Sequence, residues 1–571
     1  MNIKKYKKNI IFFIIIGMAI IFRLYNIETD EVMTDEGNYA MRAIGWNDFM
    51  QSGTLTTPWN WYANQDKLPF WTLLSFNDHP PMHFFFIWLS THIFGVHLWA
   101  VRLPSVIFGI GTIVLVFLIL KKFQFKLGAY CAAVFLAVLP WHIYITRQAI
   151  QESGVMFFLA LTFYLIVIAQ TCPEKIKNLL WILSGASLGA GIMTKYSMVV
   201  IFPVIFYWAI KKKWFKQKYF YYFISAIFLM VFPVIIYNYN VYILRHHFDL
   251  QLSRFFGMDT SIDWPASKQQ LWQGGVDLFI KYYSRLFFWI SAFGMITLYA
   301  GLLFIIKDFV SYKSEMKTKM GELGNDIYIM SFGMVLVASV FISLTLTDSG
   351  RSSIIIPFIT LSFGLCAEIF YRKKNTFLLS IVIISIVTLG VTSLGDRIGK
   401  VLVPKNISYS FFREPLGFVA WENWQKENLH ITDSPIHFTS LSDWLNHYEK
   451  IINGNKTPII VYDQKMQWWA TNWYFYRHSF YSDPLPMIEA NNLIALLLQK
   501  RFSLEGKEVY YIQSQNNARD AYAQNDAFSK KFEEITQNTV NKNNIDPIII
   551  KNYKNKIFML VWRYTWEAGE L

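Results

Sequence analysis

The chain has 571 residues, of which 54% are hydrophobic and 16% are charged, and its formal net charge is +14. Apolar segments of membrane-spanning length recur through residues 1–395, which excludes an ordinary soluble protein. The excess lysines cluster between these segments, where they orient the chain against anionic lipid headgroups, so we assign no nucleic-acid role. The three cysteines have no metal-like spacing and indicate neither a disulfide framework nor a zinc site.

The N-terminal segment predicts how the chain enters the membrane. Four lysines lie within the first eight residues, and residues 9–22 carry no charge. No small-residue cleavage site follows, so we predict a retained first helix with a cytoplasmic N-terminus. Residues 26–102 are then an external loop rich in acidic residues. Within it, residues 82–95 are apolar but short, and we expect a helix embedded from the outer side that does not cross.

Eleven membrane-spanning helices are predicted. They cover residues 9–25, 103–120, 127–145, 154–170, 179–193, 197–210, 219–238, 277–306, 327–346, 354–370 and 376–394. With this arrangement every lysine cluster falls on the cytoplasmic side, and counting residues 82–95 as a further span would place all of these clusters outside. Residues 1–395 are therefore predicted to be a multi-pass domain of the cytoplasmic (plasma) membrane, in contact with the lipid bilayer.

Residues 396–571 are more polar, and we predict that they form a soluble α/β domain outside the cytoplasm. Short runs rich in apolar and β-branched residues predict strands at 458–462, 509–512 and 557–562. Helical periodicity with polar caps predicts helices at 442–451, 488–499 and 518–535.

Charged residues gather at the predicted external ends of the helices. Asp35 and Glu36 follow the first span, and they are joined there by His79, Arg102, Arg147, Glu152, Lys195 and Arg351. A carboxylate can take the proton from an attacking hydroxyl group, and cations can stabilise a leaving phosphate. This combination predicts transfer from a lipid-linked phosphate whose tail lies between helices. Each residue alone also has an ordinary interpretation, as a solvated acid, a snorkelling arginine or a solvated hairpin lysine.

Five motifs follow one another along the chain: Thr34-Asp35-Glu36-Gly37-Asn38-Tyr39-Ala40, Asp78-His79-Pro80-Pro81, Arg102-Leu103-Pro104-Ser105, Arg147 with Glu152, and Thr194-Lys195. This order resembles the protein O-mannosyltransferase and lipid A aminoarabinose transferase superfamily, over about residues 1–400. The resemblance implies the C-type glycosyltransferase fold and an inverting glycosyltransferase that uses a polyprenyl-phosphate sugar as its donor. The implied acceptor is a hydroxyl group of a protein, lipid or glycan on the external face of the membrane.

The resemblance also implies roles for single residues. Asp35 is the expected catalytic base, with Glu36 beside it in the motif. The resemblance also places Arg102 near the donor. Because the charged groups share one membrane face, the expected ligands of the donor phosphate are Arg102, Arg147, Lys195 and Arg351, and the expected supporting residues are His79, Glu152 and Tyr39. Protein mannosyltransferases tend to have a lysine shortly after the two prolines, whereas this chain has Met82, His83 and Phe84. The phosphate contact of that lysine is therefore not carried over.

The sequence leaves cofactor and function partly open. The candidate cofactor is a divalent cation, and its weak candidate ligands are His246, His247 and Asp249. A transporter or flippase of lipid-linked sugars and a non-catalytic membrane subunit are the alternative functions. Charges at the outer helix ends and the lack of an internal repeat favour the enzyme. Neither the sugar nor the acceptor can be read from the sequence.

Overall fold

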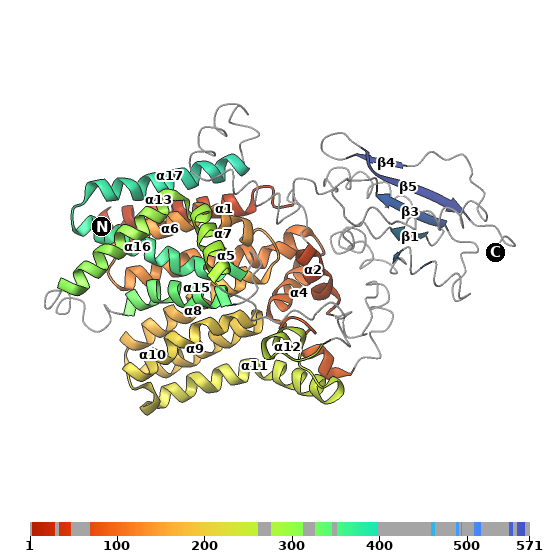
Figure 1. The fold of residues 1–571 in the computed structure, drawn as a ribbon, viewed down its shortest axis with the longest axis horizontal. Coiled ribbons are helices and arrows are strands. Elements are labelled where there is room, and N and C mark those ends of the chain that lie inside the picture. Colours follow the sequence, from red (N-terminus) through yellow and green to blue (C-terminus); the bar gives the residue numbers. More distant parts are fainter. Residues whose placement is uncertain are drawn as a thin grey trace. The chain divides into compact units, whose positions relative to one another are not determined.

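The structure is a computed structural model, and it describes residues 3–28, 34–46, 69–260, 276–311, 326–344, 351–397, 458–462, 487–489, 493, 508–514, 548–551 and 557–565. Helices predominate as far as residue 397, and strands follow (Figure 1). The contacts divide the chain into two compact units. The first unit contains Met1–Ile27, Phe70–Ser90 and Arg102–Asn428, and the second contains Glu28–Pro69, Thr91–Val101 and Leu429–Leu571.

Each of the eleven segments predicted to be a membrane helix contains helix in the described residues, although Leu139 and Ser291 interrupt two of them. The structure forms them as α1 (Ile3–Leu24), α5 (Leu98–Lys122), α6 (Lys126–Val138) with α7 (Pro140–Thr146), α8 (Gln151–Thr171), α9 (Glu174–Thr194), η4 (Tyr196–Ile201) with α10 (Phe202–Lys211), α11 (Lys218–Arg245), α13 (Val276–Ser311), η6 (Ile329–Gly333) with α15 (Met334–Leu344), α16 (Ile356–Arg372) and α17 (Thr376–Arg397). Shorter elements are α2 (Thr34–Gly45), η3 (Phe70–Leu74), α4 (Met82–Phe94), η5 (Trp214–Lys216), α12 (Leu250–Phe256) and η7 (Arg351–Ile355).

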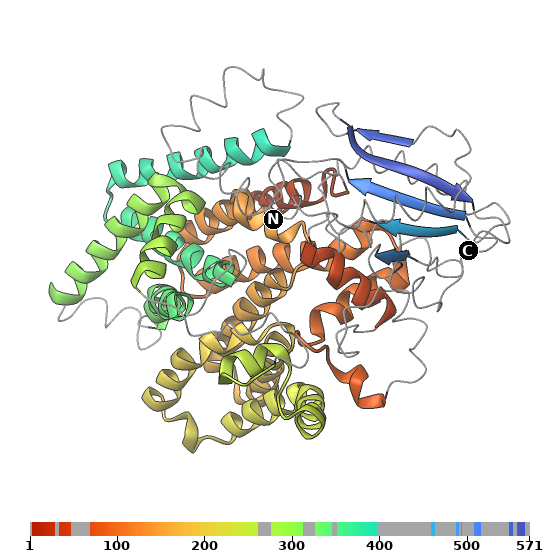
Figure 2. The same cartoon turned by 45° about the vertical axis from the view of Figure 1, so that its right-hand side comes forward.

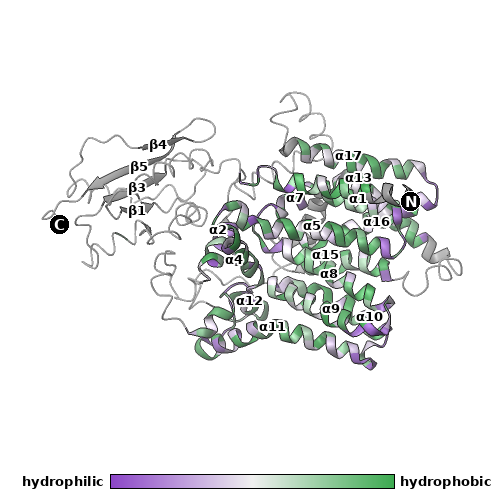
Figure 3. Ribbon diagram, turned by 180° about the vertical axis from the view of Figure 1, so that it is seen from behind, coloured by the Kyte–Doolittle hydropathy of each residue, from purple (hydrophilic) through white to green (hydrophobic). Residues whose placement is uncertain are grey.

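Length and composition identify membrane helices within the described residues. Seven of these helices are long and apolar enough to cross a membrane, or eight if α6 and α7 form one span. Hydrophobic residues run along the helices of the first unit, and hydrophilic residues gather near their ends (Figure 3). The chain is therefore a polytopic helical membrane protein.

The third predicted span is two helices, because Pro140 interrupts it. α6 ends at Val138, Leu139 is extended with φ −67° and ψ 113°, and α7 starts at the proline. The two helices are bent by 61°. A residue before proline avoids the helical region, whereas proline itself is tolerated in the first turn of a new helix. The continuous helix predicted over residues 127–145 is therefore wrong.

The external loop predicted at residues 26–102 contains more helix than expected. Asp35 and Glu36 lie in the first turn of α2 and not in an irregular loop. Acidic side chains are favoured there because the N-terminal end of a helix carries a partial positive charge. α4 has 13 residues, so it is roughly 20 Å long and shorter than the hydrocarbon core of a bilayer. The helix predicted at 82–95 is therefore present, and its embedding from the outer side stays a prediction.

Contacts between side chains show which helix ends lie together in the first unit. α9 packs against both α8 and α11 (Figure 1). Near the start of α9, the Lys177 ammonium lies 5.4 Å from the ring centre of Tyr219, near the start of α11. Lys212, after α10, forms an ion pair with Asp326 and a hydrogen bond to Gln170 of α8. The starts of α9 and α11 and the ends of α8 and α10 therefore share one end of the bundle.

α6 and α16 cross at two glycines. A Cβ atom on Gly128 would lie 2.3 Å from the Gly364 carbonyl oxygen, and one on Gly364 would lie 2.6 Å from that of Gly128. Small residues at such crossings let membrane helices approach closely. Glu368 accepts a hydrogen bond from the Gly128 N–H at 3.0 Å, and its other oxygen lies 2.9 Å from Arg372 Nε. The contact thus combines backbone proximity with a buried carboxylate that has two partners.

We expect the variant Gly128→Val to destabilise this domain by about 3 kcal/mol, because the new side chain must displace the backbone of α16. Thermal unfolding of the purified protein in detergent, followed by intrinsic fluorescence, measures the effect. Gly17→Val is the control, since a Cβ atom at Gly17 would meet nothing within 4 Å. An equal unfolding midpoint for the two variants would contradict the close crossing.

The strands of the second unit form one five-stranded sheet of order β2-β1-β3-β5-β4 (Figure 2). β1 (Pro458–Tyr462) pairs in parallel with β2 (Met487–Glu489) and with β3 (Glu508–Ser514). β5 (Ile557–Thr565) runs antiparallel to β3 and to β4 (Ile548–Lys551). The sheet is therefore mixed, with its parallel pairs on one side and its antiparallel pairs on the other.

The three strands predicted at the C-terminal end are confirmed as β1, β3 and β5. β2 and β4 were not predicted. β2 includes the first two residues of the helix predicted at 488–499, so that helix does not start where it was placed. The helices predicted at 442–451 and 518–535 lie outside the described residues.

Candidate functional site

Four of the predicted site residues lie at one end of the first unit, where α1 ends and α8 begins. Arg102, near the start of α5, donates to the Ile27 carbonyl just beyond α1. Arg147, at the end of α7, also binds carbonyl groups at the end of α1. Glu152, in the first turn of α8, forms an ion pair with Lys195, which directly follows α9. This end of the bundle is opposite to the end that holds Lys177 and Lys212, because α8 and α9 each run from one end to the other.

The Arg147 guanidinium binds the C-terminal end of α1. Its Nη1 donates to the carbonyls of Phe22, Arg23 and Tyr25 at 3.3, 2.9 and 2.8 Å, and its Nη2 donates to that of Asn26 at 2.9 Å. The last carbonyls of a helix lack intrahelical donors, and a cation beside them is favoured by the helix dipole. Arg147 thus caps α1 in this structure, and its role toward a donor phosphate stays a prediction.

The Glu152–Lys195 pair lies beside two histidines. In the loop before α4, the His79 Nδ1 atom is 3.0 Å from Asp78 Oδ1. His83, one turn further along the chain, is fully buried, and burial lowers its pKa to about 4. The charges of Glu152, Lys195 and His79 also act on this pKa. Asp78, the two histidines and the ion pair therefore form one polar cluster.

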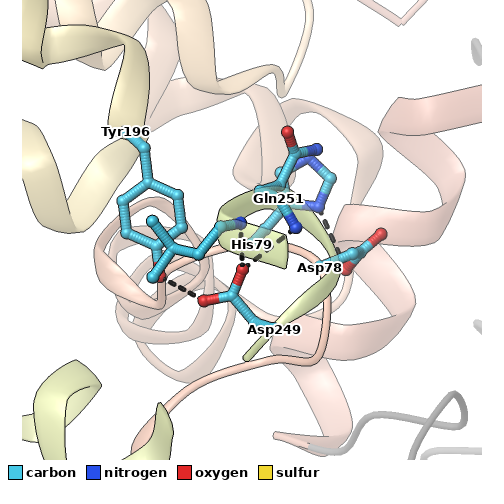
Figure 4. Close-up of polar contacts among 6 residues, drawn as sticks. Asp78, His79, Tyr196, Asp249 and Gln251 are labelled. Atoms are coloured by element: carbon cyan, nitrogen blue, oxygen red, sulfur yellow. Dashed lines mark hydrogen bonds and ion pairs between the residues drawn. The ribbon is translucent and has the colours of Figure 1, made fainter. Parts of the chain in front are cut away.

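Asp249 connects three helices next to this cluster (Figure 4). Its Oδ2 atom accepts hydrogen bonds from the Tyr196 hydroxyl at 2.6 Å and from Asn238 Nδ2 at 2.9 Å. Its Oδ1 atom accepts from the backbone N–H groups of Gln251 and Leu252, both at 3.0 Å, which makes Asp249 the N-cap of α12. Burial raises the pKa of this carboxyl group. The carboxylate thus ties together the start of η4, the last turns of α11 and the start of α12.

The motif Asp78-His79-Pro80-Pro81 is attached to the same network through the backbone. The Leu250 N–H donates to the Asn77 carbonyl at 2.7 Å, directly before the motif. The Phe76 N–H donates to the His79 carbonyl at 3.3 Å, which closes the turn. Figure 4 shows Asp78 and His79 together with Asp249. The turn is therefore held against the start of α12.

The three candidate metal ligands have other contacts. Both carboxylate oxygens of Asp249 accept hydrogen bonds, as described above. His247 is buried with its Nδ1 atom 2.5 Å from the Phe248 carbonyl oxygen, whereas His246 is exposed. Among the described residues, no group of three or more His, Cys, Asp or Glu side chains is arranged to hold a metal ion. We assign Asp249 to the structural network, and a divalent cation stays a prediction.

Asp35, Glu36 and Tyr39 belong to α2 and to the second unit. Asp35 is exposed, whereas Glu36 and Tyr39 are 0% and 4% exposed. α2 therefore presents the first acid of the pair at its surface and buries the second. Arg351 begins η7, and its side chain lies outside the described residues. The predicted roles of these residues stay predictions.

Sequence reasoning missed several polar residues at this bundle end. Arg23 is fully buried, and its Nη2 atom lies 2.7 Å from His142 Nδ1. Gln151 is also fully buried, and within the described structure its Oε1 and Nε2 atoms have no hydrogen-bond partner. An unsatisfied buried amide costs free energy, so Gln151 is suited to contact a ligand or water. Its position directly before Glu152 was the signal that could have found it.

We expect His83 to make stability depend on pH between its folded pKa of about 4 and its ordinary value of 6.5. In this range the folded protein keeps His83 neutral while the unfolded chain binds a proton, so stability falls as the pH is lowered. His83→Asn removes this titration. The difference in thermal midpoint between wild type and His83→Asn should therefore shrink from about pH 7 to about pH 4.5. The control is His92→Asn, because His92 is exposed. A difference in thermal midpoint between wild type and His83→Asn that stays constant with pH would contradict the lowered pKa of His83.

Sequence comparison supports the order of motifs. Residues 78–237 match the family described as dolichyl-phosphate-mannose-protein mannosyltransferase. The chain is 26% identical over 198 residues to YkcB and 30% identical over 151 residues to YycA, both from Bacillus subtilis (strain 168) and both named as candidate mannosyltransferases. These matches cover 34% and 25% of this chain. They cover 25% and 20% of the two relatives, so the chain spans at most a quarter of their length.

Comparison of structures extends over nearly the whole chain. ArnT from Cupriavidus metallidurans bound to undecaprenyl phosphate has a TM-score of 0.54 and 11% identity, covering 96% of this chain and 97% of ArnT. The apo state of ArnT has a TM-score of 0.55 and 12% identity, covering 98% of each chain. The resemblance found in the sequence is thus confirmed. The chain has the fold of the C-type glycosyltransferases, and over residues 78–237 its sequence is similar to the mannosyltransferase family.

Proposed function

We propose that this protein is an inverting glycosyltransferase that moves a sugar from a polyprenyl-phosphate donor to an acceptor hydroxyl on the outer face of the cytoplasmic membrane. The observation that carries the proposal is the meeting of Arg102, Glu152 and Lys195 at one bundle end in a chain with the ArnT fold. The similarity to named mannosyltransferases and the undecaprenyl phosphate bound by ArnT support this class of donor. The named charges lie at helix ends and not at mid-bundle, which favours an enzyme over a transporter.

Asp35 acts as the general base in this mechanism. Its carboxylate accepts the proton of the acceptor hydroxyl while the hydroxyl oxygen attacks the anomeric carbon. The bond between that carbon and the phosphate oxygen breaks, and the polyprenyl phosphate leaves with the electron pair. Attack from the side opposite to the leaving group inverts the configuration. Exposure of Asp35 in its unit gives the acceptor access to the carboxylate, and the buried Glu36 and Tyr39 hold the start of α2.

Lys195 and Arg102 stabilise the negative charge that develops on the leaving phosphate. Lys195 is a point charge held in place by Glu152, and Arg102 is a fully buried guanidinium. His79 lies in the same cluster and supports it. Arg351 is proposed as a further phosphate ligand from its sequence position alone. Arg147 acts on the same site chiefly by fixing the end of α1.

The proposed topology has eleven crossings. The long apolar helices and the bent α6–α7 pair are joined by the shorter apolar helices at Ile10–Leu24, Tyr196–Lys211 and Asp326–Ile342. α4 stays at the outer face. The lysine-rich ends then face the cytoplasm, as does the N-terminus, and residues 396–571 form an extracytoplasmic α/β domain built on the observed sheet. The acceptor is a protein, lipid or glycan.

Asp35→Asn keeps the shape of the side chain but removes the base, so we expect the rate of transfer to fall by at least about 100-fold. Membranes that contain the purified protein, supplied with labelled polyprenyl-phosphate mannose, report transfer to membrane components. Glu174→Gln is the control, because Glu174 is 79% exposed and pairs only with Lys177 in the described structure. Wild-type turnover by a folded Asp35→Asn protein would exclude Asp35 as the base.

Variants of the Glu152–Lys195 pair distinguish a role of Lys195 in phosphate binding from a purely structural role. We expect Lys195→Met to raise the KM for the donor by about tenfold or more, since one charged contact to the phosphate is lost. Glu152→Gln alone should lower stability, because it leaves the Lys195 ammonium, whose side chain is only 15% exposed, without its carboxylate. The double variant should recover stability but keep the high KM. Recovery of both properties in the double variant would show that the pair is structural only.

A further inference from the structure

A cleft lined only by apolar side chains opens at the opposite end of the first unit from the candidate site. Its volume is about 390 Å³, which is in the range of small-molecule binding pockets. The residues that form it include Phe206 and Ala209 of α10, Phe215 of η5, and Phe220, Phe223 and Ile224 of α11. Phe206 and Phe215 are 59% and 43% exposed, so the cleft is open on the outer surface of the bundle.

Basic residues lie in the turn that contributes Phe215 to this cleft. Lys211, Lys213, Lys216 and Lys218 are exposed, and they lie in and beside the turn that joins α10 to α11. Lys213 adopts the left-handed conformation with φ 53°, which a lysine rarely does. α11 begins without a side-chain cap, so its first N–H groups also favour an anion.

Three acidic residues described at this end are already paired. Glu174 Oε1 lies 2.6 Å from Lys177 Nζ, and Glu368 Oε1 lies 2.9 Å from Arg372 Nε. Asp326 is paired with Lys212. The positive charge of the turn is therefore not neutralised by these three carboxylates.

The position of the cleft separates it from the chemistry proposed above. α9 starts beside α11 at the cleft end and finishes at Lys195 in the polar cluster. α9 has 21 residues, so the two sites are roughly 30 Å apart, about the thickness of the hydrocarbon core. A donor phosphate bound near Lys195 cannot at the same time contact the lysines of the turn.

We infer that this cleft binds an anionic phospholipid of the leaflet opposite to the candidate site, with an acyl chain in the cleft and the phosphate group at Lys213, Lys216 and Lys218. Each part of the surface matches one part of that molecule. The apolar lining suits a hydrocarbon chain, and basic side chains at a membrane surface attract anionic headgroups. The inference does not depend on the proposed transferase activity.

Native mass spectrometry of the full-length protein tests the inference. The purified protein is mixed with phosphatidylglycerol or phosphatidylcholine in detergent, and the retained lipid is counted. We expect wild type to retain phosphatidylglycerol preferentially. The variant Lys213→Gln/Lys216→Gln/Lys218→Gln should lose this retention by at least about tenfold, because several cation–phosphate contacts disappear.

Two control variants make the result specific. Lys121→Gln/Lys122→Gln/Lys126→Gln removes the same charge from another lysine cluster and should keep the lipid. Ile224→Trp narrows the cleft and should lose the lipid, whereas Ile384→Trp on α17 should keep it. Ile384 is a matched control for Ile224, because the two side chains are 43% and 44% exposed.

Three outcomes would overturn the inference. The first is unchanged retention of phosphatidylglycerol by the variant of Lys213, Lys216 and Lys218. The second is an equal loss in the Lys121, Lys122 and Lys126 control, which would indicate only a general effect of charge. The third is a loss of added polyprenyl phosphate, and not of phospholipid, in the cleft variants, which would assign the cleft to the donor. Transfer activity in detergent should be unaffected, so failure here is distinct from failure of the proposed function.

Discussion

A charge buried among membrane helices is stable only when partners replace the water that it has lost. This constraint acts at both ends of the first unit. At one end Arg102 and Arg147 bind carbonyl groups at the end of α1, and Lys195 pairs with Glu152. At the other end Lys212 pairs with Asp326. These contacts determine which helix ends meet, and so they determine which residues the candidate site in this unit contains.

Membrane helices could be predicted because apolar length is a property of a continuous stretch of sequence. Each of the eleven predicted stretches contains helix in the described residues for this reason. The break at Pro140 was present in the sequence, but hydropathy alone averages across it. α2 was missed because its polar first turn carries no long apolar run. β2, with three residues, is too short to show an alternating pattern.

The clustering of Arg102, Glu152 and Lys195 could be predicted because helices that alternate in direction bring every second end to the same face. The Asp249 network could not be predicted. Tyr196 and Asp249 are 53 residues apart, and a hydrogen bond at that separation leaves no local pattern. The same holds for Arg147, whose sequence neighbours do not show that it will cap a helix 122 residues earlier. Sequence order therefore predicts which residues meet more readily than what each one binds.

The crossing of Gly128 and Gly364 limits how this membrane domain can move. The two backbones are so close that neither glycine has room for a Cβ atom, and Glu368 bonds across the same contact. α6 and α16 must therefore travel as a single rigid body. A lipid tail that enters or leaves between helices has to use a different gap. Any route for exchange of a long-chain substrate then also avoids α9 and α11, where a Cβ atom on Gly185 would lie 2.2 Å from the Phe223 carbonyl oxygen.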